Sequence, residues 1–238
     1  MYLTLYHFFP EKLNLYGDRG NVITMQKRCE WRGIELRVVE VRSDAPPLHE
    51  ADIMLIGGGS DREQDLVTRD LEKIKDEFKS AIDDGVSCLA VCGGYQFLGE
   101  YYQLPNGDKL KGMQLFDFYT VSKPGRLTGN ILMESDAFGR IVGFENHGGR
   151  TYHEYDPLGR VVKGHGNNGE DSKEGIHYKN LLGTYLHGPV LPKNPSMADY
   201  LIGQAMLRKY GTSDLMPLDD RMEESAKEKI WDNKMKEQ

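Results

Sequence analysis

The sequence predicts an α/β fold in which a mainly parallel central sheet is flanked by helices and carries an antiparallel insertion. Residues 1–92 alternate strand-like and helix-like segments with short connections, the pattern of a parallel sheet that is covered on both faces. Residues 112–165 change to short alternating segments between Gly, Pro and Asp turns, which is typical of antiparallel strands or a hairpin. A last apolar segment over 181–186 predicts one more buried strand.

The elements of the first half follow from the spacing of apolar residues and from the Gly and Pro residues that end each segment. In chain order we expect a strand over 1–9, a helix over 21–31, strands over 34–41 and 53–56, a helix whose apolar positions are Leu66, Leu71, Ile74, Phe78 and Ile82, and a strand over 86–91. A glycine triplet follows the strand over 53–56, and Cys92 follows the strand over 86–91.

In the second half we expect strands over 113–121, 127–133 and 141–144, a polar, mobile loop over 164–175, and a helix over 197–210. No repeat or linker is present, so the expected division is one domain over 1–210 and a charged tail over 211–238 that is helical or mobile. A tail with such mixed charges is more often a solvated helix than a docking surface.

Composition excludes several classes of function. The 238 residues carry a net charge of −7, which gives no electrostatic reason to bind nucleic acid or an anionic membrane. No apolar run reaches the roughly 20 residues of a membrane span, and the N-terminus lacks the features of a signal peptide. Three cysteines without a framework of spacings predict reduced thiols, a cytoplasmic location and no cysteine zinc site.

Cys92 is the strongest candidate for a catalytic residue. An apolar strand leads directly into Cys92, Gly93 and Gly94 follow, and a helix-compatible run comes next, which is the pattern of a nucleophile elbow. A helix N-terminus favours a thiolate, and the N–H of Gly93 would point to a developing oxyanion. The alternative, a buried structural cysteine, fits Cys88 within the same strand better than it fits Cys92.

Two further segments are expected at the same edge of the sheet. The Gly57–Gly59 loop could supply a second oxyanion N–H, although a plain turn or a phosphate-binding loop without its G-K-S/T continuation are the alternatives. His187 follows the strand over 181–186 and could act as the base for Cys92, or else be a solvated loop histidine.

The remaining histidines carry weaker signals. His147 lies in an unusual polar loop and could line a site, whereas His49 and His177 are expected at the surface. His153 and His165 could join His147 as metal ligands, but no regular spacing supports a metal site.

Five motifs together resemble the class I (triad-type) glutamine amidotransferases, in the branch of the cobyric acid synthase amidotransferase domain (CobB/CobQ-like). They are Asn14–Asn21, Ile56–Gly59, Ala90–Gln96, Gly143–Thr151 and Gly183–Pro189. The resemblance covers about residues 3–210 and implies a flavodoxin-like fold. The opening N-L-Y-G-D-R-G-N is most similar to the glutaminase subunits of lipid II isoglutaminyl synthase.

The resemblance implies a role for each matching residue. Cys92 would attack the side-chain amide of L-glutamine to form a thioester, and His187 would protonate the leaving ammonia and then activate water. The N–H groups of Gly58 and Gly93 would bind the oxyanion. Gln96 would help to orient the substrate, and Arg126 would bind its carboxylate, although without the resemblance Arg126 looks like an exposed turn arginine.

The resemblance also implies a partner. A MurT-like Mur-ligase subunit would form a heterodimer with this chain, bind ATP and Mg²⁺, and handle the lipid-linked acceptor at the inner face of the membrane. This chain shows no P-loop, and no cofactor or metal is expected in it. The ammonia would amidate the D-glutamate α-carboxyl of the lipid II stem peptide in peptidoglycan synthesis.

One position departs from the class pattern. Most class I members carry a Glu two residues after the histidine, and here that position is Pro189. The resembling branch also lacks this Glu, so a third carboxylate must come from elsewhere or be absent. Because the base must be held in the right tautomer, we expect the chain alone to be a weak glutaminase that a partner completes. The alternatives are a glutaminase for a cobyrinate-type synthetase, a non-catalytic scaffold or glutamine sensor, and a self-sufficient hydrolase such as a γ-glutamyl peptidase.

Overall fold

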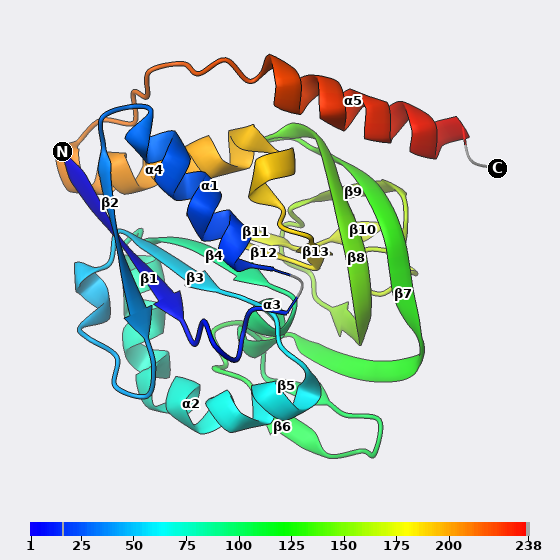
Figure 1. The fold of residues 1–238 in the computed structure, drawn as a ribbon. Coiled ribbons are helices and arrows are strands. Elements are labelled where there is room, and N and C mark those ends of the chain that lie inside the picture. The colour runs from blue at the N-terminus through cyan, green and yellow to red at the C-terminus, as the bar shows by residue number, and fades with distance from the viewer. Residues whose placement is uncertain (16, 237–238) are drawn as a thin grey trace.

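The structure is a computed structural model that describes residues 1–15 and 17–236, and six strands form its mainly parallel sheet (Figure 1). In spatial order they are β11 (Ile176–Tyr178), β12 (Leu181–Thr184), β4 (Ser87–Val91), β3 (Ile53–Ile56), β1 (Tyr2–Phe8) and β2 (Glu35–Val41). Within this described sheet only β11 runs antiparallel to its neighbour. The parallel strands, numbered along the chain, lie in the order 2-1-3-4-5, so the predicted flavodoxin-like class is confirmed.

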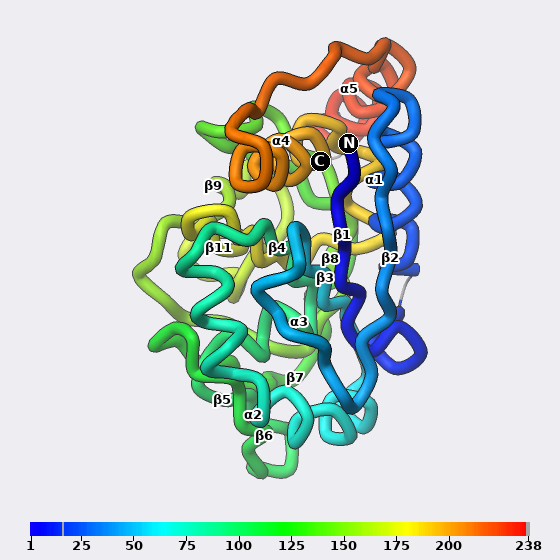
Figure 2. The backbone as a smooth tube through the Cα atoms, turned by 90° about the vertical axis from the view of Figure 1, so that its left-hand side faces the viewer, coloured from blue at the N-terminus to red at the C-terminus, as the bar shows by residue number. Residues whose placement is uncertain are grey.

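Helices cover both faces of this sheet (Figures 1 and 2). The helices α1 (Arg19–Glu30) and α4 (Pro195–Tyr210) contact each other on one face, and α2 (Asp61–Asp83) lies on the other. A capping box fixes the start of α2, because the side chains of Ser60 and Glu63 each accept the backbone N–H of the other residue. The cap anchors the end of the glycine triplet that precedes the helix.

The centre of the sheet positions the candidate site. Every residue of β3 and β4 is buried, as expected for central strands between two layers of helices. Parallel pairing places Ile56 opposite Ala90, and Val91 opposite Thr184. The residues that follow β3, β4 and β12 therefore emerge at one edge of the sheet.

A second, largely antiparallel sheet is built on a long hairpin of β7 (Tyr119–Ser135) and β8 (Gly139–Tyr152) (Figure 1). Its other strands are β5 (Tyr101–Gln103), β6 (Lys109–Lys111), β9 (Gly159–Lys163), β10 (Lys173–Glu174) and β13 (Leu186–His187). The separate strands predicted over 113–121 and 127–133 are wrong in their bounds, because one continuous strand begins at Tyr119. Its pairing register shifts between Ser122 and Leu127, where Pro124 has no N–H to donate.

The loop over 164–175 is also more structured than its composition predicts. Asn167 and Asn168 are buried, and their side chains satisfy the backbone of the loop. Oδ1 of Asn167 accepts the N–H of Gly175 at 2.8 Å, and Oδ1 of Asn168 accepts the N–H of Glu170 at 2.8 Å. Here the two asparagines mark a hydrogen-bonded turn whose centre is buried, although residues 169–172 of the loop are exposed.

The C-terminal segment forms helix α5 (Arg221–Lys236), which lies across the β7–β8 hairpin (Figure 1). Trp231 is buried against Leu132 and Val142 of that hairpin. The buried guanidinium of Arg28 joins α1 to the segment before α5 through Asp220. None of the helices described, α5 included, is long and apolar enough to cross a membrane.

Candidate active site

Cys92 lies between the end of β4 and the start of α3 (Gly93–Phe97), at the carboxyl edge of the parallel sheet. Its backbone has φ 52° and ψ −105°, a conformation that is rare for a residue with a Cβ. Such strain at a strand-to-helix turn is the geometry of a nucleophile elbow. A methyl group on Gly94 would overlap the carbonyl oxygen of Ile56, so the turn requires a glycine there.

His187 is brought to the same place by β13, where it pairs with Phe144 of β8. Gly58 lies against both residues. A methyl group on Gly58 would lie 3.0 Å from Cβ of Cys92 and 3.2 Å from Cε1 of His187. The structure thus brings together the cysteine, the histidine and the glycine loop that the sequence analysis expected at one edge of the sheet.

Burial keeps this pair uncharged. It raises the pKa of the Cys92 thiol to about 12, and the nearby carboxylate of Asp18 adds to this effect, while the N–H of Gly93 and the guanidinium of Arg126 oppose it. Burial also lowers the pKa of His187 to about 3, and electrostatic interactions with His147, Arg126 and Lys193 lower it further. At neutral pH a thiol therefore faces a neutral imidazole, which can accept its proton.

The Gly57–Gly59 loop rests on the Asn14–Asn21 motif, whose Tyr16 lies outside the described residues. The buried carboxylate of Asp18 accepts the N–H of Gly58 on Oδ2 at 2.7 Å. The carbonyl of Gly58 accepts the N–H of Leu15 at 2.9 Å. Both backbone polar groups of Gly58 are thus engaged by the N-terminal motif, although its N–H was expected to face an oxyanion.

The same motif also packs against the segment after His187. Pro189 occupies the position where most class I members carry Glu, and a methyl group on Gly20 would overlap its ring. Oδ1 of Asn21 accepts the N–H of Leu191 at 3.0 Å. The proline therefore packs against α1, and a cyclic apolar side chain cannot orient an imidazole by hydrogen bonding.

A cleft of about 630 Å³ opens beside Cys92. Arg126 and Gln96, both predicted to contact substrate, line it. The amide Nε2 of Gln96 donates to the hydroxyl of Tyr185 at 3.1 Å. A volume of this size, with a thiol, an amide and a guanidinium on its walls, can hold a small amino acid.

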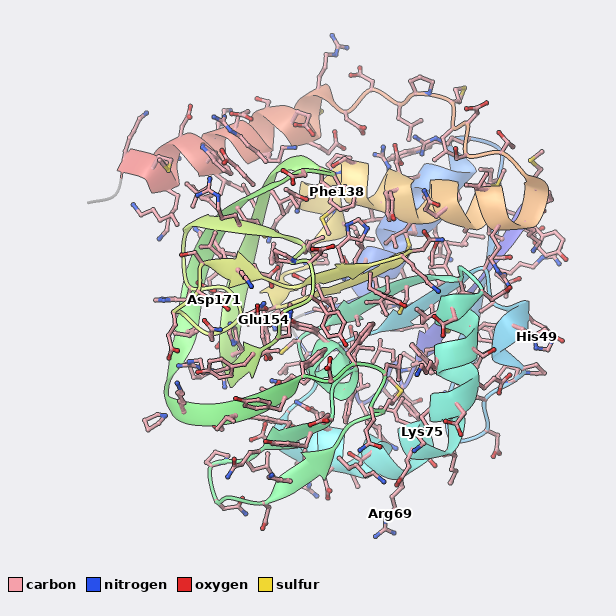
Figure 3. The ribbon with its side chains drawn as sticks, turned by 180° about the vertical axis from the view of Figure 1, so that it is seen from behind. His49, Arg69, Lys75, Phe138, Glu154 and Asp171 are labelled. Carbon is pink, nitrogen blue, oxygen red and sulfur yellow. The ribbon has the colours of Figure 1, made fainter. Side chains whose placement is uncertain are left out.

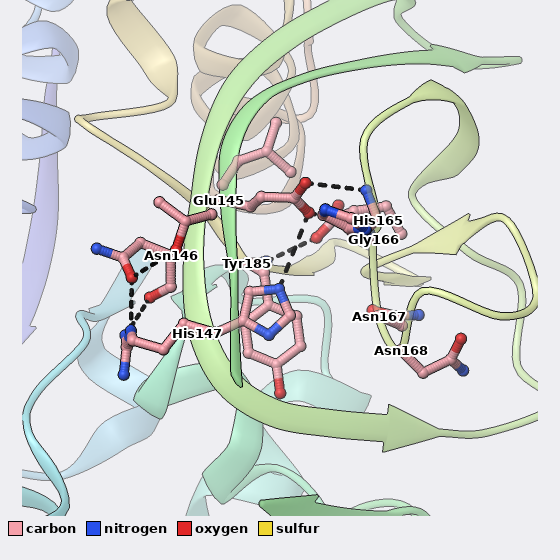
Figure 4. Close-up of polar contacts among 12 residues, drawn as sticks. Glu145, Asn146, His147, His165, Gly166, Asn167, Asn168 and Tyr185 are labelled. Carbon is pink, nitrogen blue, oxygen red and sulfur yellow. Dashed lines mark hydrogen bonds and ion pairs between the residues drawn. The ribbon is translucent and has the colours of Figure 1, made fainter. Parts of the chain in front are cut away.

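Arg126 is held by a residue that the sequence analysis did not single out. Its Nε donates to Oδ1 of Asn146 at 2.7 Å, and one terminal nitrogen donates to the backbone carbonyl of Asn146 at 2.6 Å (Figure 4). Asn146 lies in β8 directly opposite Thr128 of β7. Only the pairing of these two strands reveals this contact, although Asn146 is part of the Gly143–Thr151 motif.

His147 also lines the cleft, as its polar loop suggested. Its ring stacks on Tyr185 with centroids 3.7 Å apart (Figure 4). Its Nδ1 lies 2.8 Å from the carbonyl oxygen of Gly149. Nε2 of His147 lies 3.9 Å from Oε2 of Glu145, whose carboxylate accepts the N–H groups of His165 and Gly166. The network fixes β8 beside the cleft.

The other histidines lie outside this group. His153 approaches the hydroxyl of Tyr95 at 2.9 Å within the core, and His165 is exposed. His49 is exposed at the periphery, as expected (Figure 3), whereas His177 is half-buried, stacks on Phe138 and so departs from its expected surface position. In the described part of the chain no three His, Cys, Asp or Glu side chains are placed to hold a metal ion.

Comparison with known sequences places this geometry among known proteins. The model of the CobB/CobQ-like glutamine amidotransferase domain matches residues 4–195. The lipid II isoglutaminyl synthase (glutamine-hydrolyzing) subunit GatD of Staphylococcus aureus (strain N315) is 55% identical over 231 residues, which are 97% of this chain and 95% of that protein. The subunit of the same name from Streptococcus pneumoniae (strain ATCC BAA-255 / R6) is 36% identical over 98% of this chain and 92% of its own length.

The solved structures agree on the fold. The structure of PurLQS from Thermotoga maritima contains a chain that superposes with a TM-score of 0.57. The match covers 87% of this chain and 98% of that one, at 17% sequence identity. At this identity the likeness concerns the fold alone.

Proposed function

We propose that this chain, which belongs to the CobB/CobQ-like glutamine amidotransferase family, is a glutaminase subunit of a lipid II isoglutaminyl synthase. The observation that carries the catalytic part is the strained Cys92 elbow, which lies with His187 against Gly58 beside a cleft that Arg126 lines. The acceptor is proposed from the near full-length similarity to the two GatD subunits.

The proposed reaction begins when Sγ of Cys92 attacks the side-chain amide carbon of L-glutamine while its proton passes to the neutral imidazole of His187. The tetrahedral intermediate places negative charge on the amide oxygen, which the N–H of Gly93 and an N–H of the Gly57–Gly59 loop would bind. The carbon–nitrogen bond then breaks, and His187 returns the proton to the leaving ammonia. A glutamyl thioester remains on Cys92.

Hydrolysis of the thioester completes the cycle. His187 removes a proton from water, the hydroxide adds to the thioester carbon, and the thiolate leaves and is reprotonated. The sum is glutamine plus water to glutamate plus ammonia. Arg126 would bind the α-carboxylate of the substrate through charge-assisted hydrogen bonds, and Gln96 would orient the substrate from the wall of the cleft.

We infer that a MurT-like Mur-ligase subunit completes the enzyme, working in the cytoplasm at the membrane face where its lipid-linked acceptor lies. It would bind ATP and Mg²⁺, activate the D-glutamate α-carboxyl of the stem peptide and receive the ammonia. It would also complete the environment of His187, because Pro189 cannot act as the third group. In this chain, residues 1–210 would form the amidotransferase domain and 211–238 an appended tail.

The test is ammonia release from L-glutamine by the purified chain, with and without a co-expressed MurT-like subunit, beside the Cys92→Ala variant. We expect slow release by the chain alone, faster release with the partner and none from the variant. Release that does not depend on Cys92, or none under any condition, would contradict the glutaminase. Full activity without a partner would contradict the two-subunit site.

A further inference from the structure

Asp18 is a buried carboxylate that the proposed reaction does not use. It is fully buried at the start of α1, and its Oδ2 accepts the N–H of Gly58 at 2.7 Å. Oδ1 is also buried and has no hydrogen-bond partner among the residues that the structure describes. Burial raises the pKa of this carboxyl to about 7, although the N–H of Gly58 opposes the shift. A buried carboxyl with half of its hydrogen-bonding capacity unused is costly, so its position calls for a role.

The hydrogen bonds of the glycine loop determine which of its N–H groups can bind an oxyanion. Asp18 already engages the N–H of Gly58. The carbonyl of Gly57 accepts the N–H of Gly94 at 3.1 Å, and the carbonyl of Gly58 accepts the N–H of Leu15 at 2.9 Å. Because a trans peptide is planar, the N–H of Gly59 points away from the Gly58 carbonyl and therefore away from Leu15. Gly59 lines the cleft beside Cys92.

We propose that Asp18 is a positioning residue for the oxyanion site, which it controls by holding the N–H of Gly58 and so leaving the N–H of Gly59 to act together with that of Gly93. The inference rests on the proposed glutaminase reaction and replaces Gly58 by Gly59 as the donor from the loop. The glycine at 58 is then required for space, because a side chain there would meet Cys92 and His187.

The Asp18→Asn variant distinguishes a hydrogen-bond acceptor for the N–H of Gly58 from a carboxylate that acts through its charge. An amide oxygen can still accept the N–H of Gly58, whereas Ala leaves that N–H buried without an acceptor. A carboxylate that acted by its charge, for example by orienting His187, would be lost equally in both variants. A loss of kcat in Asp18→Ala that is absent in Asp18→Asn would therefore indicate that Asp18 acts as a hydrogen-bond acceptor that fixes the loop.

The experiment compares Asp18→Ala and Asp18→Asn with the wild type in the complex with the co-expressed partner. We expect Asp18→Ala to lower kcat for L-glutamine by about 10²- to 10³-fold, the loss typical of one oxyanion donor, with KM changed less than about threefold. Asp18→Asn should stay within about fivefold of wild type, because the acceptor remains.

Alkylation of Cys92 by iodoacetamide, followed by mass spectrometry at one pH, supplies a second readout. This displacement forms no tetrahedral oxyanion, so the Asp18→Ala variant should react at least as fast as the wild type, since a negative charge near the thiol is gone. Asp52→Ala is the matched control for lost stability. Asp52 is buried far from the cleft and accepts the N–H of Thr4 at 2.7 Å.

Each outcome decides one point. Unchanged or raised kcat in Asp18→Ala, equal loss in Asp18→Asn, or a parallel fall in alkylation would overturn the role of Asp18. A loss of kcat in Asp52→Ala equal to that in Asp18→Ala, at matched thermal stability, would also overturn it. Absence of Cys92-dependent ammonia release from the wild type would instead overturn the proposed function. This outcome is distinct, because it is seen in the wild type before any variant is compared.

Discussion

Two residues of the cleft that are proposed to contact the substrate, Arg126 and Gln96, are oriented by neighbouring side chains. Arg126 is exposed, and an exposed arginine has many conformations of similar energy. Its two hydrogen bonds to Asn146 select one of them and direct the guanidinium along the cleft. In the same way Tyr185 holds the amide of Gln96. If these residues bind the substrate as proposed, this arrangement would reduce the entropy lost on binding.

Replacement of Arg126 tests its proposed contact with the substrate carboxylate. We expect Arg126→Ala to raise KM for L-glutamine by about 10- to 100-fold with a smaller effect on kcat, because a charged hydrogen bond contributes about 1.5–3 kcal/mol and acts on bound substrate and transition state alike. Asn146→Ala should raise KM by a smaller factor, about three- to tenfold, since the guanidinium remains but is less well oriented. Steady-state kinetics of ammonia release measure both.

Arg69→Ala serves as the control, because Arg69 is exposed on α2 and points away from the protein (Figure 3). It should leave both constants unchanged. A fall in kcat with constant KM in Arg126→Ala would place the arginine in the transition state and not in substrate binding.

The elements around Cys92 meet so closely that the turn depends on glycine. Gly94 lies where α3 starts, directly over the carbonyl of Ile56 at the end of β3. Gly203 is buried within α4, but a methyl group there would make only ordinary van der Waals contacts, the nearest at 3.5 Å from the backbone oxygen of Ser213. The two positions contain the same residue for different physical reasons.

Alanine substitution should therefore have opposite effects at the two sites. We expect Gly94→Ala to lower the free energy of unfolding by about 1–3 kcal/mol through overlap with backbone that cannot move freely. Gly203→Ala should raise it by about 0.5–1 kcal/mol, because alanine favours the helix. Urea unfolding measures both. A neutral Gly94→Ala would mean that β3 and α3 can separate.

At the scale of the whole molecule, the buried carboxylate of Glu174 joins the two sheets. Glu174 of β10 accepts the N–H of Tyr185 at 2.7 Å and the hydroxyl of Thr184, between β12 and β13. Burial raises the pKa of Glu174 to about 8, and the nearby carboxylate of Glu145 adds to the shift, while the contacts to Tyr185 and Thr184 oppose it. The folded chain thus binds this proton more tightly than the unfolded chain does.

The stability of the protein should depend on pH accordingly. The contribution of Glu174 is fully present below pH 4.5, its unfolded value, and is lost as pH rises through about 8. Glu174→Gln should make unfolding free energy less dependent on pH over this window, by at most about 1.4 kcal/mol per pH unit. Urea unfolding at pH 5, 6, 7 and 8 gives the slope.

Glu170→Gln, at an exposed position of the same loop, is the control and should not reduce the fall in stability between pH 5 and pH 8. If the wild type and Glu174→Gln had equal slopes, Glu174 would not be protonated in the folded state at the pH values where the unfolded chain is ionised.

The sequence by itself determined the parallel sheet, the Cys92 elbow and the family. These depend on local signals, namely runs of apolar residues, the two glycines that follow a strand, and motifs of a few consecutive residues. The place of His187 beside Cys92 could be expected because parallel strands end at one edge. The bounds of β7 could not be predicted from the sequence. Pro124 and Gly125 indicate a break between two strands, but pairing with β8 continues on both sides of them.

Only the tertiary structure decided how the site is held together. The contacts of Asp18 with Gly58, of Asn146 with Arg126, and of Gly20 with Pro189 join residues that are 40, 20 and about 170 positions apart. The choice between Gly58 and Gly59 as the donor from the loop depends on the first of these contacts. No local pattern encodes such pairs, because the free energy that selects them arises only when distant segments are packed and their polar groups leave water.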